Sequence, residues 1–233
     1  MRATMDTPAH ERRQYLAFGI LSLVAVGFTA ILSLSQDGAR FFEVYFGSIP
    51  PPLAVALAAL GGFGSLGFLL SRGGFEIYTS RSVRGVGLSA AIATLFGVWQ
   101  IGADLLVTRF PKDINVPSPQ SWLFYPAIGY VVEVFFHALP LALLLAVLGR
   151  STKKSNPTIV IWLCIVFVSS LEPVLVHIRM GASAYVGVFV FVFTVVELHV
   201  FRRYDFISMY SFRLAFYMWW HITWGYMRLQ WLF

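Results

Sequence analysis

The sequence predicts an all-α, polytopic membrane protein: a bundle of about seven transmembrane helices. Of its 233 residues, 58% are apolar and only 12% are charged, and the mean hydropathy is +0.74. A water-soluble domain carries roughly 25% charged residues, because its surface must be solvated. The low charged fraction therefore indicates that most of the surface of this protein faces lipid.

Seven stretches are long and apolar enough to cross the hydrocarbon layer, which takes roughly 17–25 helical residues. The predicted spans are residues 15–35, 53–70, 86–107, 122–148, 157–177, 184–201 and 207–226. The first span follows a polar start and has no small-residue cleavage site behind it, so we interpret it as a membrane anchor. We expect a single membrane domain over residues 1–233, with three spans and their loops up to residue 121 and a helical core over 122–226.

The distribution of basic residues predicts the orientation of the chain. With the N-terminus in the cytoplasm, eleven Lys and Arg residues outside the spans lie on the inside and five on the outside. This bias favours a cytoplasmic N-terminus in a multi-pass protein of the cell (inner) membrane. It also accounts for the net charge of +6, so we expect no nucleic-acid partner. The single cysteine, Cys164, can form no disulfide within the chain.

Ionisable residues are costly inside a membrane, so they normally face the interior of the bundle and often mark function. Here they gather in the last four spans: Glu133, His137, Glu172, His177, Glu197, His199, Arg213 and His221. Glu133 and His137 are four residues apart and share a helix face, so we expect the two side chains to meet. The alternative for each group is an interhelical hydrogen bond with no further role.

Other positions in these spans carry more specific expectations. Pro140 should loosen the helical hydrogen bonds near Phe136, and Pro173 should interrupt the fifth span. Glu197 and His199 are two residues apart and point to different faces, so we interpret them as interfacial. Arg213 is expected to extend its side chain toward the inner surface.

Three runs in the later spans resemble the motifs of the CPBP intramembrane proteases, which include the Ras-converting CAAX proteases and many bacterial relatives. Residues 132–137, Val-Glu-Val-Phe-Phe-His, resemble the Glu-Glu-x-x-x-Arg helix of that family. Residues 169–171 leading to His177 resemble the second motif, a Phe four residues before a His. His221 with Gly225 resembles the third, His-x-x-x-Asn or Asp.

The resemblance implies a membrane bundle and, in an active member, hydrolysis by a water that a glutamate and a histidine hold. A later histidine and an amide side chain then stabilise the oxyanion. By position, Glu133 matches the second glutamate, His177 the second-motif histidine and His221 the third-motif histidine.

The chain departs from these motifs at four positions. Val132 stands in place of the first glutamate, which is the catalytic one in the family, and His137 replaces the arginine. Pro173 replaces the phenylalanine, and Gly225 replaces the final amide. Glu172 is the alternative candidate for the missing base.

Three functional hypotheses follow from these residues. In the first, the chain is a divergent intramembrane peptidase, with Glu133 or Glu172 as base and His177 and His221 as partners. In the second, it is a catalytically impaired relative that serves as an accessory or scaffold subunit. The third is a redox or proton-relay protein, with His177 and His221 as axial haem ligands. For the first two we expect no cofactor and no metal. The expected partners are the lipid bilayer and membrane proteins that contact the transmembrane helices.

Overall fold

The structure is a computed structural model that describes residues 8–71, 74–148, 157–181 and 183–233; within these ranges the side chains of residues 8, 9, 157, 176, 177, 179 and 180 are outside the description. The helices are α1 (Pro8–Leu32), α2 (Gln36–Arg40), α3 (Glu43–Phe46), α4 (Pro51–Ser71), α5 (Ser82–Leu106), η1 (Lys112–Ile114), α6 (Ser121–Val132), η2 (Glu133–Ala138), α7 (Leu139–Leu148), α8 (Pro157–Ser169), α9 (Leu171–Met180), α10 (Ala184–Arg203), α11 (Phe206–Tyr217), η4 (Met218–Trp224) and α12 (Gly225–Trp231). No strand occurs in the described ranges, so the all-α prediction is confirmed.

Within the described residues, six helical stretches are long and apolar enough to cross a membrane. They are His10–Leu32, Pro51–Ser71, Ser82–Leu106, Ser121–Leu148, Thr158–Leu175 and Ala184–Arg203, and they correspond to the first six predicted spans. The seventh predicted span, 207–226, is also helical, as α11, η4 and α12, but it is not among these six. Arg213, His221 and Arg228 add polar side chains to this stretch.

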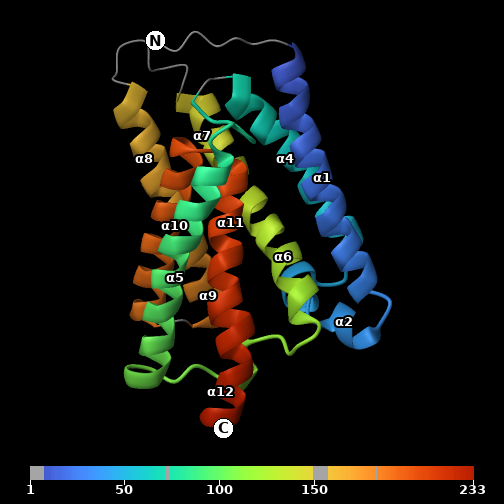
Figure 1. Ribbon diagram of the computed structural model, residues 1–233, viewed down its shortest axis with the longest axis vertical. Coiled ribbons are helices and arrows are strands. Elements are labelled where there is room, and N and C mark those ends of the chain that lie inside the picture. Colours follow the sequence, from blue (N-terminus) through green and yellow to red (C-terminus); the bar gives the residue numbers. More distant parts are fainter. Residues whose placement is uncertain (1–7, 72–73, 149–156, 182) are drawn as a thin grey trace.

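The last helical stretch is the centre of the bundle. Figure 1 shows α11 surrounded by α5, α6 and α10, and close packing of α11 against these three helices agrees with the picture. A cluster of rings fills the interface with α10, where Phe193 lies 4.8 Å from Phe212 and 4.7 Å from Phe216 between ring centroids. Because it is enclosed by other helices, α11 tolerates polar side chains that lipid would not solvate.

Both breaks expected from proline are present. The segment η2, just ahead of Pro140, is a π-helix. In it the backbone N–H of Leu139 donates to the carbonyl of Val134, which is five residues earlier in the chain. Helix α8 ends at Ser169 and α9 begins at Leu171, so the fifth span is interrupted just ahead of Pro173. A second π-helix, η4, includes His221. Widened turns of this kind are frequent at functional sites.

Polar contacts hold neighbouring segments together at each end of the bundle. At the end where the chain starts, the Asp205 carboxylate caps α11 by accepting from the Ser208 N–H at 2.8 Å, and it also accepts from Thr79 and Ser82. At the opposite end, Arg228 donates to Asp104 through Nε at 2.8 Å and Nη2 at 3.1 Å. Both side chains of this second pair are fully buried.

Candidate functional site

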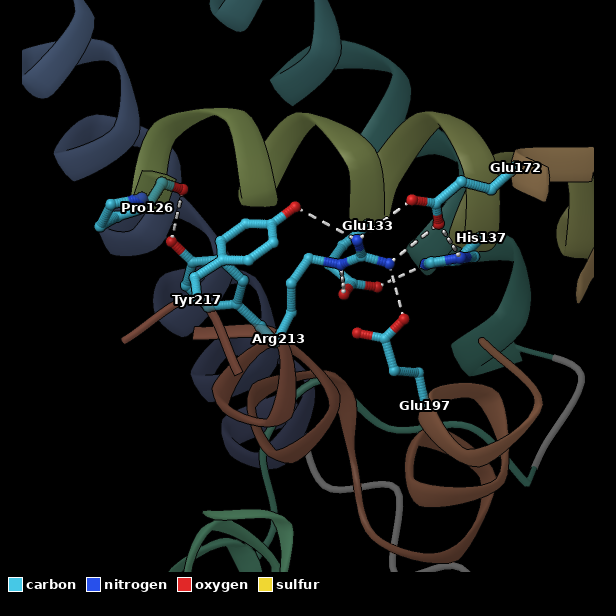
Figure 2. A network of polar contacts seen from close by, with 8 residues as sticks. Pro126, Glu133, His137, Glu172, Glu197, Arg213 and Tyr217 are labelled. Atoms are coloured by element: carbon cyan, nitrogen blue, oxygen red, sulfur yellow. Dashed lines mark hydrogen bonds and ion pairs between the residues drawn. The ribbon is translucent and has the colours of Figure 1, made fainter. Parts of the chain in front are cut away.

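Five ionisable side chains from four elements meet in the interior of the bundle, and we call them the central network. Figure 2 shows Glu133 and His137 on η2, Glu172 on α9, Glu197 on α10 and Arg213 on α11, all pointing toward one another. Glu172 is the most exposed of them, with 17% of its side chain accessible, and the others are at most 3% exposed. Apart from this edge of Glu172, the network is enclosed within the bundle.

The Arg213 guanidinium is the hub of this network. Its Nε donates to Glu133 Oε1 at 2.7 Å, and its Nη2 donates to Glu197 Oε2 at 2.6 Å. The two terminal nitrogens also reach Glu172, at 3.1 Å and 3.3 Å, in the fork geometry that suits a carboxylate. Nη1 contacts the Tyr217 hydroxyl at 3.3 Å as well. One cation thus joins carboxylates from three different elements.

Glu133 and His137 form the contact that their spacing predicts. The His137 Nδ1–H donates to Glu133 Oε2 at 2.6 Å, so both oxygens of this carboxylate are engaged. On the other side of the ring, His137 Nε2 lies 3.6 Å from Glu172 Oε2, which is too long for a hydrogen bond. His137 Nε2 and Glu197 Oε1 are buried atoms without a hydrogen-bond partner in the described part of the chain.

His221 lies two helical turns beyond Arg213 and has a different set of neighbours. Its Nδ1–H donates to the Asn115 side-chain oxygen at 2.7 Å, and its ring stacks on Tyr125 with centroids 4.4 Å apart. Gly225 makes room for this arrangement, since a Cβ there would lie 2.9 Å from Asn115 Nδ2. That amide nitrogen is buried and has no partner among the described residues.

The structure therefore brings together three of the five candidate site residues, Glu133, His137 and Glu172. It places His221 in a neighbouring pair with Asn115. The side chain of His177 lies outside the described residues, so the convergence of Glu133, His177 and His221, and the haem hypothesis that uses both histidines, stay predictions.

Two interpretations made from the sequence are wrong. Glu197 is fully buried and bound to Arg213, and so is not interfacial. The Arg213 side chain is 3% exposed and turns into the network instead of extending toward the membrane surface. Both follow from the same cause: when an arginine has three carboxylates within reach inside the bundle, pairing with them satisfies its donors.

Asn115 was not recognised as a site residue from the sequence. It lies in the Pro-rich loop between α5 and α6, where asparagine is common because its side chain stabilises turns. Only the fold of the loop onto the last helix reveals its contact with His221.

Comparisons with known proteins give no match: no protein-family model, no curated protein and no solved structure matches the chain.

Proposed function

We propose that this chain is a multi-pass protein of the cell (inner) membrane, similar to the CPBP intramembrane proteases, in which the hydrolytic chemistry is impaired. Its role would be that of an accessory or scaffold subunit in a larger membrane complex. The excess of Lys and Arg on one side supports a cytoplasmic N-terminus.

The engagement of Glu133 carries this proposal. A general base must take a proton from the water that it activates. Both oxygens of Glu133 already accept a hydrogen bond, one from Arg213 at 2.7 Å and the other from His137 at 2.6 Å, and these bonds stabilise the carboxylate and so make it a weaker base. Val132, at the position of the family's catalytic glutamate, offers no carboxylate. The same groups are well arranged to hold α9, α10 and α11 on η2.

The outer face of α4 supports a role in assembly. A Cβ built at Gly61 or Gly64 meets no atom within 4 Å, so these two glycines lie on the outside of the bundle. Small residues on an exposed helix face let the backbone of another transmembrane helix approach closely, which is one way that such helices associate in lipid. The occupant that we propose for this face is a transmembrane helix of a partner subunit.

Mild-detergent purification from native membranes, followed by mass spectrometry of the intact particle, tests the assembly role. The wild-type chain is expected to carry a partner in fixed stoichiometry, and Gly64→Leu is expected to lose it while the chain itself stays folded. Gly27→Leu is the matched control, because that glycine on α1 is also open to the outside. A wild-type chain that always purifies alone refutes the assembly role.

Active intramembrane peptidase is the second candidate, and the Asn115–His221 pair favours it. The buried Asn115 Nδ2, which has no partner among the described residues, supplies near His221 the kind of amide that Gly225 lacks. An oxyanion hole needs donors of this kind, placed in advance. Cleavage of a membrane-proximal peptide that is lost in both Glu133→Gln and Asn115→Ala, with folding intact, would establish the peptidase and overturn the impaired reading.

A further inference from the structure

The charges of the central network do not balance. Three carboxylates, Glu133, Glu172 and Glu197, surround one guanidinium, Arg213, and the described residues bring no other permanent cation into contact with them. With His137 neutral, two negative charges are left over. Uncompensated charge is expensive inside a membrane protein, so the network must bind either protons or a cation.

The donor atoms of the network are placed to accept that charge as one ion. Glu133, His137 and Glu197 each contribute a ligand atom, and these three atoms lie within 4.8 Å of one another. Donors around a tetrahedral zinc ion lie roughly 3.4 Å apart, so shifts of about 1 Å would close the set on a metal. Figure 2 shows the Glu197 carboxyl group extending from α10 toward the Glu133 side chain.

Two buried atoms that lack partners point to the same conclusion independently. Glu197 Oε1 is fully buried and accepts no hydrogen bond from any described residue, although a carboxylate oxygen there needs a proton or a cation. His137 Nε2 is equally buried and unpaired, and it faces Glu172 Oε2 at 3.6 Å. Groups of this kind in a native interior need an explanation, and a bound ion is one that also fits the three donor atoms.

We propose that the central network binds one divalent transition-metal ion, of the Zn²⁺ type, through Glu133, Glu197 and His137. His137 would bind through Nδ1, and its single ring proton, which it now donates to Glu133, would move to Nε2, so the imidazole would stay neutral. The ring hydrogen would then be on Nε2 and point at Glu172, the carboxylate–histidine–metal arrangement that orients such ligands. Imidazole and carboxylate ligands together suit zinc and its neighbours.

This ion would neutralise the two excess charges while Arg213 keeps its contacts with Glu172 and with one oxygen each of Glu133 and Glu197. The inference does not depend on the proposed function, because either an accessory subunit or a peptidase could contain such a centre. It replaces the earlier expectation from the sequence that the chain holds no metal.

The test is the metal content of purified protein after exposure to Zn²⁺ and removal of free ion, measured by inductively coupled plasma mass spectrometry. Wild type is expected to retain about one Zn²⁺ per chain, and Glu197→Gln at least tenfold less. Glu76→Gln is the control, because Glu76 is partly exposed and lies near His10, at the end of the bundle where the chain starts. Retention in wild type and Glu76→Gln with loss in Glu197→Gln supports the site.

A second measurement on wild type alone covers the case in which Glu197→Gln does not fold. Co²⁺ is expected to give visible absorption bands that Zn²⁺ abolishes by competition, and a chelator should lower the midpoint of thermal unfolding. No Co²⁺ bands and no chelator effect in wild type overturn the proposal. Full Zn²⁺ retention by folded Glu197→Gln also overturns it, and protons then balance the network.

Discussion

Arg213→Met removes the only guanidinium of the central network while keeping a long apolar side chain in its place. The substitution breaks ion pairs of 2.7, 3.1 and 2.6 Å to Glu133, Glu172 and Glu197 and leaves their carboxylates facing one another. Removing one partner of a buried ion pair typically costs about 3–5 kcal/mol, because the other charge stays buried without compensation. Since three partners lose their cation here, we expect a loss of at least about 3 kcal/mol.

The free energy of unfolding can be measured by SDS titration of the purified protein in mixed micelles. A loss of about 3 kcal/mol changes the unfolding equilibrium by more than roughly 100-fold, well outside experimental scatter. Arg84→Met is the matched control, since that exposed arginine on α5 makes no ion pair with a described residue. Addition of Glu197→Gln to Arg213→Met should restore part of the stability by removing one unpaired charge. A cost below about 1 kcal/mol, or a further loss in the double variant, would refute the reasoning.

Two further perturbations test packing and the second ion pair. Gly62→Ala should destabilise the bundle by about 1–3 kcal/mol, since a Cβ there would overlap the Phe18 ring, whereas Gly61→Ala next to it should change stability by less than about 1 kcal/mol. Thermal unfolding of the two variants side by side measures the difference, and equal effects would contradict the packing described here. Asp104→Asn should cost about 3–5 kcal/mol in the same titration, because its arginine partner is fully buried, while the exposed Asp113→Asn should have little effect. If Asp104→Asn loses no more stability than Asp113→Asn, the buried ion pair does not stabilise the bundle as described.

Properties that depend on local sequence were predictable. The second and third spans, expected at 53–70 and 86–107, are Pro51–Ser71 and Ser82–Leu106, because hydrophobic length alone sets such boundaries. The contact between Glu133 and His137 was also expected, and the structure places their atoms 2.6 Å apart, since a spacing of four fixes the shared face.

Properties that depend on which helices meet were not predictable. Arg213 pairs with Glu197 over 16 positions and with Glu133 over 80, and no periodicity within one helix contains that information. The last helix was expected to be an ordinary span, yet it is the enclosed centre of the bundle, where burial by protein permits charges that lipid would exclude. Asn115 shows the same limit, because its partner His221 is 106 residues away.

The Asp205 junction bears on the order in which this protein is completed during translation. Thr79 donates to an acceptor 126 residues further along the chain, and the carbonyls of Glu76 and Ile77 accept from Phe206 and Ile207. The loop that precedes α5 leaves the ribosome well ahead of Asp205, Phe206 and Ile207, which supply these acceptors and donors. Until the start of α11 emerges, the loop has no carboxylate to organise it, so nascent chains that stop short of Asp205 should expose the loop to protease at the membrane surface.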